Sequence, residues 1–431
     1  MFIKTAWVEK LFHGTEVANN MKQILTLLIV LALAHTAIGR TWQADSKNPD
    51  KSIQATINRA APGDTIIVLP GVYREKLITV NKQLYLLGKD FPVLDGESKH
   101  EILLIEADGV VVQGFRIENS GSSGYLDIAA VKVMGVRNVI VRGNRINNTF
   151  FAIYIQRAVN CIIAENEISS HAKMEAKSAN GIHCWKSDSL SILNNRITGH
   201  RDGIYFEFVT NSLIKGNRSF NNLRYGLHFM FSHSDTYIDN VFTNNGAGVA
   251  VMYTRKVRML NNTFSENWGS SSYGILLKDI SDSDIEGNVF LNNTSGIHME
   301  GSSRILITRN TFRQNGWGLK IQASCDDNVI RQNNFFSNTF DVATNGSNSL
   351  NEFDANYWDK YEGYDLNRDG VGDVPFRPVS LYSMIVERNP STMMLFRSFM
   401  VTLLDKAEKV IPSITPLNLV DNKPRMKPER L

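Results

Sequence analysis

The stretch from Gly203 to Tyr253 decides the fold, and it reads GIYFEFVTNSLIKGNRSFNNLRYGLHFMFSHSDTYIDNVFTNNGAGVAVMY. One pattern occurs three times in it: a glycine, an alternation of apolar and surface residues, and a turn that contains asparagine. The three copies begin at Gly203, Gly226 and Gly248. A short pattern that returns at a fixed period indicates a solenoid.

Turn asparagines show how far the repeat extends. They recur at intervals of 22 to 29 residues: Asn144, Asn166, Asn195, Asn217, Asn240, Asn262, Asn288, Asn310, Asn333 and Asn356. A second asparagine column lies five places later, from Asn222 to Asn338. This period is too short for two helices and suits one coil of a parallel β-helix, in which equivalent asparagines can bond along a column. The longer intervals place extra residues in loops, one of them His171–Asn180.

The predicted fold class is therefore all-β, a right-handed single-stranded parallel β-helix over residues 40–361. Ile53–Ile57 is expected to form a short amphipathic helix that caps the first coil, because an uncovered β-helix end is an unpaired edge. A turn at Ala61–Asp64 and a strand at Thr65–Leu69 should follow. A net charge of +3 is too close to neutral to indicate a nucleic-acid partner.

Residues 1–39 are predicted to be an upstream extension and a cleavable signal peptide. Lys22 supplies the positive charge, Ile24 to Ala34 the apolar run, and Ala37-Ile38-Gly39 the small residues of the cleavage site. The sequence leaves open whether translation starts at Met1 or Met21. No later segment approaches 18 apolar residues, so we expect an exported chain without a transmembrane segment.

Residues 362–431 are expected to form an appendage of three parts. The first is an Asp-rich loop with Asp365, Asn367, Asp369 and Asp373 at calcium-type spacing, for which a turn that caps its own amides is the alternative. The second is a helix over Ser391–Lys409, which either packs on the solenoid or docks a partner. The third is an extended, Pro-rich tail over Ile411–Leu431, with too few apolar residues to pack as a core.

The three cysteines, Cys161, Cys184 and Cys325, give no disulfide framework because their number is odd. Cys184 falls in the column of inward apolar residues that includes Phe206 and Phe229. A buried thiol is therefore expected at this position.

Alternate residues of each predicted strand should face outward, because side chains alternate along a strand. The first outward column is predicted as His183, Tyr205, His228, Ala250, Leu276, His298 and Lys320. The second column is predicted as Trp185, Glu207, Met230, Met252, Lys278, Glu300 and Gln322.

Two methionines on neighbouring coils, Met230 and Met252, lie beside His228, with Glu207 one coil earlier and His183 two coils earlier. Thioethers and imidazole form a soft ligand set that favours Cu(I). The alternative is that a loop covers outward methionines that bind nothing. A glycoside hydrolase needs two carboxyl groups on the same or neighbouring coils, and Glu207 has no such partner.

Several stretches resemble the NosD family, the periplasmic β-helix proteins of nitrous oxide reductase maturation. They include Tyr225-Gly226-Leu227-His228-Phe229-Met230, Asp369-Gly370-Val371-Gly372-Asp373-Val374-Pro375, Ser398-Phe399-Met400 and Leu419-Val420-Asp421-Asn422-Lys423-Pro424. In that family the first copy often has Met-Tyr-Ser where this chain has Glu207-Phe208-Val209. The resemblance covers nearly the whole mature chain.

The resemblance implies a periplasmic, non-catalytic accessory protein. It implies work with an inner-membrane ABC transporter and a copper chaperone to supply the copper centres of nitrous oxide reductase, with Cu(I) bound transiently. The alternative prediction is a periplasmic β-helix that binds or processes carbohydrate.

Overall fold

The computed structural model describes residues 39–346, 350–410 and 419–430. The chain divides into two units, Met1–Arg40 and Thr41–Leu431, and every described strand belongs to the second. The predicted signal peptide and upstream extension lie, up to residue 38, outside the described residues.

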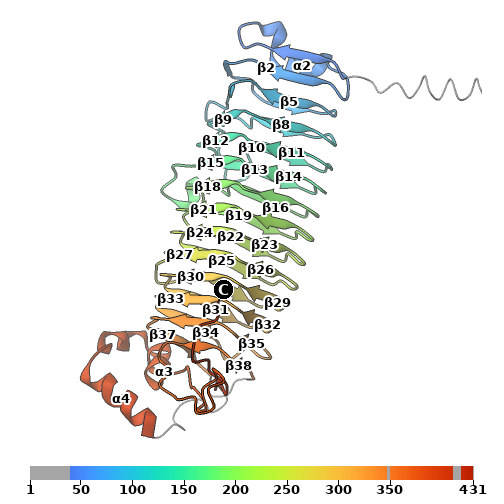
Figure 1. Ribbon diagram of the computed structural model, residues 1–431. Helices are drawn as coiled ribbons and strands as arrows, with labels where there is room; N and C mark the ends of the chain where they lie inside the picture. Colours follow the sequence, from blue (N-terminus) through green and yellow to red (C-terminus); the bar gives the residue numbers. More distant parts are fainter. Residues whose placement is uncertain (1–38, 347–349, 411–418, 431) are drawn as a thin grey trace, which may run out of the picture. The chain divides into compact units, whose positions relative to one another are not determined.

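The second unit is a right-handed parallel β-helix of about 14 coils with about 23 residues each, as the sequence predicts. Each coil adds one strand to each of three parallel sheets, which we call A, B and C (Figure 1). Adjacent strands of a sheet are therefore one coil apart in the chain.

Sheet A consists of β1 Thr41–Ala44, β2 Thr65–Val68, β5 Tyr85–Gly88, β8 Val111–Gln113, β11 Ile140–Arg142, β14 Ile162–Ala164, β17 Ser191–Leu193, β20 Leu213–Lys215, β23 Thr236–Ile238, β26 Arg258–Leu260, β29 Ser281–Glu286, β32 Ser303–Thr308, β35 Val329–Arg331 and β38 Glu352–Asp354. Sheet B consists of β3 Val72–Tyr73, β6 Val93–Asp95, β9 Arg116–Glu118, β12 Arg145–Asn147, β15 Glu167–Ser169, β18 Arg196–Thr198, β21 Arg218–Phe220, β24 Val241–Thr243, β27 Thr263–Ser265, β30 Val289–Leu291, β33 Thr311–Arg313, β36 Asn334–Phe336 and β39 Tyr357–Trp358. Sheet C consists of β4 Ile78–Val80, β7 Leu103–Ile105, β10 Ala129–Met134, β13 Phe151–Gln156, β16 Ile182–Trp185, β19 Asp202–Glu207, β22 Tyr225–Met230, β25 Ala247–Met252, β28 Ile275–Lys278, β31 Ser295–Glu300, β34 Trp317–Ile321 and β37 Phe340–Thr344.

The core is a set of stacked columns, because equivalent inward residues lie directly above one another. One aromatic column lies on the inner side of sheet B, with successive ring centroids 4.2 to 5.5 Å apart. Its members are Phe242, Phe264, Phe290, Phe312, Phe335 and Trp358. Cys184 is fully buried in another column, between Ile155 and Phe206, so the predicted buried thiol is confirmed.

The predicted asparagine ladder is present at the turn between sheets A and B. The Nδ2 group of Asn240, for example, donates to Oδ1 of Asn262 at 2.9 Å and to the carbonyl of Ile214 at 2.9 Å. The backbone N–H of Asn240 also donates to Oδ1 of Asn262, at 2.9 Å. Because these amides are buried, each rung satisfies polar groups that water cannot reach.

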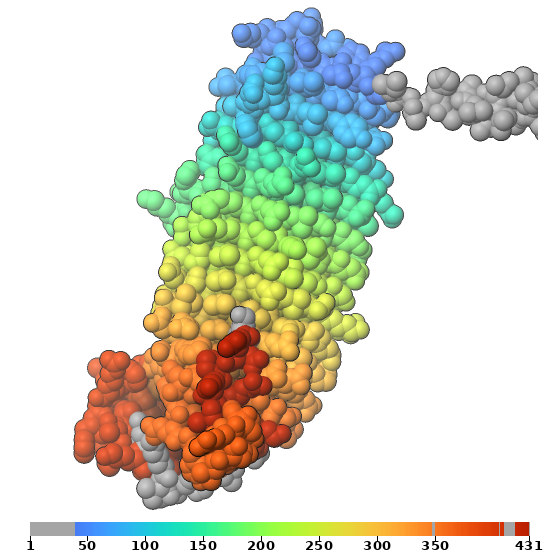
Figure 2. Space-filling view, viewed as in Figure 1, coloured from blue at the N-terminus to red at the C-terminus, as the bar shows by residue number. Residues whose placement is uncertain are grey.

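Helix α2 (Ile53–Arg59) covers the first coil, as predicted, and Ser52 caps it by accepting a hydrogen bond from the N–H of Ala55. Its buried side chains are Ile53, Thr56 and Ile57. At the C-terminal end of the β-helix, residues 419–430 return to the last coils. Figure 2 shows them in dark red against the orange surface.

The returning tail differs from the expectation of an extended segment without core packing. Leu419 and Asp421 are buried, and Asp421 forms isolated bridges with Phe353 and Phe376. The carboxylate of Asp421 takes the place of the next asparagine in the ladder: it accepts from the N–H and Nδ2 of Asn356, at 2.9 and 3.1 Å.

The helical region is also more broken than expected. Helix α3 (Leu381–Arg388), which the sequence analysis missed, packs on the last strand of sheet C through Tyr382 and Val386. A 3₁₀ segment, Pro390–Leu395, and helix α4 (Phe399–Val410) replace the single helix predicted over Ser391–Lys409. Two further 3₁₀ segments are Pro49–Lys51 and Glu175–Lys177. Within the described residues, no helix is both long enough and apolar enough to span a membrane.

Candidate functional site

Strands β16, β19, β22 and β25 bring the predicted outward residues into two columns on sheet C. The Cα partners in the first column are His183, Tyr205 and His228, in that order. In the second column Glu207 pairs with Met230, and Met230 pairs with Met252. The register of both predicted columns is therefore confirmed.

The two columns differ in burial, which the alternation pattern does not reveal. Met230, Met252 and Glu207 are half-buried, whereas His228 is only 6% exposed. The imidazole of His228 is covered because the rings of Tyr205 and Tyr225 pack on it, with centroids 4.9 Å away in both cases.

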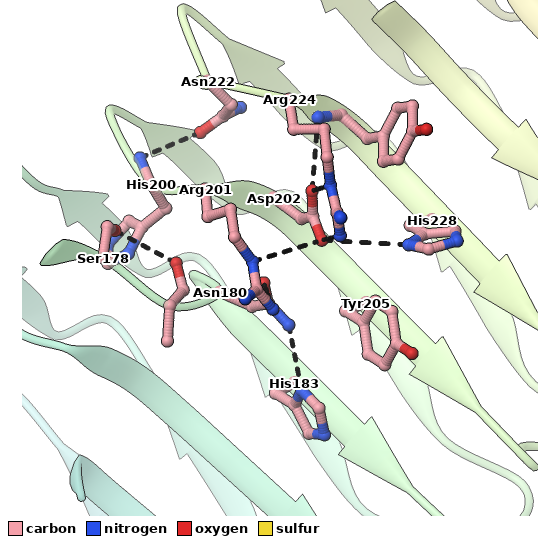
Figure 3. A network of polar contacts seen from close by, with 12 residues as sticks. Ser178, Asn180, His183, His200, Arg201, Asp202, Tyr205, Asn222, Arg224 and His228 are labelled. Atoms are coloured by element: carbon pink, nitrogen blue, oxygen red, sulfur yellow. Dashed lines mark hydrogen bonds and ion pairs between the residues drawn. The ribbon is translucent and has the colours of Figure 1, made fainter. Parts of the chain in front are cut away.

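His228 combines a nearby carboxylate with a free ring nitrogen. Its Nδ1 atom lies 3.8 Å from Oδ2 of Asp202, and neither ring nitrogen has a hydrogen-bond partner among the described residues (Figure 3). A metal-binding histidine is usually oriented by a carboxylate on one nitrogen while the other nitrogen binds the ion. The environment of His228 suits that role.

Asp202, at the start of β19, is fully buried and strongly held. Arg224 donates to both of its oxygens, at 2.9 and 2.6 Å, and the N–H of Tyr225 donates to Oδ1 at 3.3 Å. Burial acts to raise the pKa of Asp202, but the nearby ring of His228 and the hydrogen bonds and charge of Arg224 outweigh it and lower the pKa. Asp202 therefore carries a fixed negative charge behind His228.

Sequence reasoning missed the roles of Asp202 and Arg224. The sequence did contain a signal for this pair. Asp202 is an acid at a position where the next two coils have Tyr225 and Ala247, and Arg224 directly precedes Tyr225. The charges of Asp202 and Arg224 can neutralise each other only if their two coils stack, and the repeat register predicts this stacking.

Tyr205, in the first column, contacts the candidate ligand Met230 in the second column. Its hydroxyl donates to Sδ of Met230 at 3.6 Å. Burial and the neighbouring charge of Glu207 raise the pKa of Tyr205 to about 12, so the hydroxyl keeps its proton at neutral pH. A ligand that binds Sδ of Met230 through the same lone pair would displace this hydroxyl.

His183 does not join the methionine pair. Its ring is stacked between Tyr154 and Tyr205, at 4.8 and 4.9 Å, and its Nδ1 contacts Nδ2 of Asn180 at 2.9 Å. Burial, and then the charge of Arg201, lower the pKa of His183 to about 3, so the ring is neutral. Tyr205 stands between it and His228 (Figure 3).

The Asp-rich loop lies in the appendage, after the last strand of sheet B. Its oxygens accept backbone N–H groups: Asp365 accepts from Gly370 at 2.9 Å, and Asp373 accepts from Leu366 at 2.7 Å. Asn367 donates to Asp369 at 3.0 Å. These bonds are those of the amide-capping turn that the sequence left as the alternative, and the divalent-cation site at these four residues stays a prediction.

In the part of the chain that the structure describes, no three His, Cys, Asp or Glu side chains come together as a metal site. The thioethers of Met230 and Met252 with the imidazole of His228 are a different kind of set. Two soft sulfurs and one nitrogen suit a monovalent, soft cation better than calcium, magnesium or zinc.

The fold and this surface define the class as a parallel β-helix protein with a sulfur- and imidazole-bearing outer face. Residues 165–363 match the family model described as periplasmic copper-binding protein (NosD). The chain is also similar to the "Probable ABC transporter binding protein NosD" of Pseudomonas aeruginosa, with 27% identity over 81% of this chain and 85% of the relative. The protein of the same name from Stutzerimonas stutzeri is 27% identical over 83% of this chain and 86% of its own length. The chain is therefore similar to NosD proteins over most of its length.

Solved structures with a similar course of the chain are distant in sequence. Tailspike protein 3 of bacteriophage CBA120 has a TM-score of 0.53 with 12% identity, over 74% of this chain and 58% of the phage protein. The A-module of the mannuronan C-5 epimerase AlgE6 of Azotobacter vinelandii has a TM-score of 0.47 with 15% identity, over 70% of this chain and 94% of the module. The tailspike match supports the β-helix fold and says nothing about activity.

Proposed function

We propose that the protein is a periplasmic accessory protein that binds Cu(I) at Met230, Met252 and His228. It hands the ion over during assembly of the copper centres of nitrous oxide reductase. The observation that carries the proposal is the pairing of two half-buried methionines on adjacent strands, next to a histidine whose ring nitrogens have no hydrogen-bond partner in the described part of the chain. The family description as periplasmic copper-binding supports it.

The geometry of the stack favours this ligand set. Neighbouring strands lie about 4.8 Å apart, so two metal–sulfur bonds of about 2.3 Å each can meet between the two thioethers. Asp202 would hold the imidazole of His228 in position as a positioning residue, without touching the ion. Glu207 would contribute less, because a carboxylate is a harder ligand than Cu(I) prefers.

The site suits transient binding. Thioethers carry no charge, whereas thiolates, the tightest soft ligands, are absent because all three cysteines are buried. Copper is therefore cargo rather than a permanent cofactor, and binding must displace the Tyr205 hydroxyl from Met230. This competition lowers the affinity and favours release to an acceptor protein.

The appendage supports an association with an ABC transporter, the partner that the relatives' names indicate for those proteins. Helix α4 leaves Phe399, Met400 and Leu403 exposed, by 82%, 54% and 50% respectively. Large apolar side chains gathered on one short element are typical of a surface that another protein covers. We assign the docking of the transporter to α4.

The non-catalytic interpretation has support in the same residues. A polysaccharide hydrolase needs one carboxyl group that is protonated near neutral pH and a second one close to it. The buried acid beside this surface, Asp202, has a lowered pKa and is bound to Arg224, so it serves poorly as a proton donor.

The proposal is tested by titrating purified mature protein with Cu(I) in competition with a colorimetric chelator. Replacing Met230 and Met252 together by Leu should lower the affinity at least tenfold, because the loss of two soft ligands removes more than about 1.4 kcal/mol. Stability should change by less than about 1.5 kcal/mol, since Met and Leu have similar volumes.

Met134→Leu is the matched control. Met134 lies in the same outward column of sheet C, with Gln156 and not a second methionine as its neighbour. Its replacement should leave the affinity unchanged. Wild-type affinity in the double variant would contradict the proposal.

A further inference from the structure

Three aromatic side chains, two of them exposed and the middle one half-buried, form a ladder beside the methionine pair. Phe208, Phe231 and Tyr253 directly follow Glu207, Met230 and Met252 in the sequence. Their rings are stacked, with centroids 5.2 and 5.1 Å apart and planes inclined by 9° and 15°. Phe208 is 43% exposed and Tyr253 is 37% exposed, so the ladder borders the proposed copper site with apolar surface.

The backbone at the ladder is one in which large side chains are unusual. Phe208, Phe231 and Tyr253 have φ angles of 54°, 51° and 54°, in the left-handed region. The same turn position is occupied by Gly135 and Gly301 on other coils, where glycine adopts this conformation without strain. Folding alone would therefore be satisfied by glycine on these three coils.

The stacking determines what the ladder can bind. Because the rings face one another, the faces between them are covered, and Phe231 has a ring on both sides. A sugar ring stacks on an aromatic face, of which the ladder leaves only those at its two ends, whereas aromatic edges and methionines pack well in protein interfaces. The ladder thus fits a protein surface better than a glycan.

One end of the ladder is basic. Lys186 and Arg157 occupy the same turn position on the two preceding coils, and both are exposed. The Nζ atom of Lys186 lies 6.0 Å from the ring centroid of Phe208. Both cations also lie over the ring of Trp185, and among the described residues neither forms an ion pair with a carboxylate. A partner is therefore favoured if it has acidic residues at this end.

We propose that the ladder docks the protein that exchanges Cu(I) with Met230 and Met252. That partner carries Cu(I) on its own soft ligands and presents an apolar patch with acidic residues facing Arg157 and Lys186. The inference rests on the proposed function, because direct transfer of the ion requires the two metal sites to come within bonding distance. Docking on the adjoining ladder achieves this for both methionines.

The test uses the full mature chain with Phe208, Phe231 and Tyr253 all replaced by Gly. Glycine fits the backbone, so the variant should fold. Phe91→Gly is the matched control, since Phe91 is also exposed, by 36%, with a φ of 56°, but precedes β6 on sheet B. Loading with Cu(I) from a small chelate complex should be unchanged in both variants, because the ligands are intact.

Docking is measured in the periplasm with a photoreactive benzophenone residue in place of Ser234, an exposed position three residues after Phe231. We expect a cross-linked protein that binds Cu(I) by itself, with a yield at least fivefold lower in the triple Gly variant and unchanged in Phe91→Gly. Equal yields, a cross-link to a second copy of this chain, or a partner that binds no copper would overturn the proposal. Failure of the wild type to load Cu(I) from the chelate would instead refute the proposed function.

Discussion

At the scale of single residues, Met230, Met252 and His228 share the outer face of sheet C but differ in burial: both methionines are half-buried, and His228 is buried. The alternation of side chains along a strand predicted that Met230, Met252 and His228 lie on the outer face of sheet C. A strand has only two faces, and its apolar residues show which one faces the core. Burial of His228 depends on the rings of Tyr205 and Tyr225, and the Asp202–Arg224 pair on particular side-chain conformations. Neither follows from a repeat period.

Asp235 illustrates a residue-scale effect with a measurable pH dependence. It is fully buried, its Oδ1 accepts from the N–H of Ser212 at 2.8 Å, and its Oδ2 has no partner among the described residues. Burial raises the pKa of Asp235 to about 8. A raised pKa in the folded state means that its contribution to stability is fully present below the unfolded pKa, near 3.9, and is lost as the pH rises towards 8.

Asp235→Asn should therefore become more stable than wild type as the pH rises. The difference in free energy of unfolding should grow by about 1.4 kcal/mol per pH unit between pH 4 and 8 and then level off. Urea denaturation of both proteins across this range measures it, with Asp284→Asn, at a half-buried position, as control. A constant difference at all pH values would contradict the assignment.

At the scale of elements, the asparagine ladder was the most predictable feature, because a side chain that bonds to its own copy must recur with the period. The helices were the least predictable. The apolar spacing of residues 391–409 suits one helix, yet Pro390 begins a 3₁₀ segment and α4 starts only at Phe399. Helix α3 is stabilised by Tyr382 and Val386 against the last strand of sheet C, a contact far away in the sequence.

Asn262→Ala tests the ladder. The change removes the acceptor of the buried N–H of Asn240 and one acceptor of its Nδ2 group, which keeps the carbonyl of Ile214. An unsatisfied buried donor costs about 1–3 kcal/mol, so we expect a loss of this size in unfolding free energy. Asn261→Gly, at the exposed neighbouring position with a φ of 52°, should cost far less. Equal losses in chemical denaturation would mean that the ladder adds no stability.

At the scale of the whole molecule, the unit from Thr41 onward is closed at the far end by a segment distant in sequence. Each asparagine of the ladder accepts hydrogen bonds at Oδ1 from the asparagine one coil before it. Its N–H donates to the asparagine one coil after it. The last member needs only to accept, which suits the carboxylate of Asp421. The sequence could not assign the tail to the solenoid. Asp421 follows Asn356 by 65 residues, a separation that does not match the length of one coil.

Asp421→Ala should weaken the last coils selectively. It removes the acceptor of Asn356 and of the indole N–H of Trp358, which donates to Oδ2 at 3.0 Å. Hydrogen exchange should accelerate at β38 and β39 and stay unchanged at β19 and β22. Asp421→Asn, which keeps an acceptor oxygen, should have a smaller effect. Uniform acceleration along all coils would show instead that the tail stabilises the solenoid as one unit.

Copper K-edge X-ray absorption of the Cu(I)-loaded mature protein reports directly whether a thioether pair and one imidazole hold the ion. We expect two sulfur scatterers at about 2.3 Å and one nitrogen scatterer, with both sulfurs lost when Met230 and Met252 are replaced by Leu. A spectrum with only nitrogen and oxygen scatterers, or one with sulfur that survives in the double variant, would contradict this expectation.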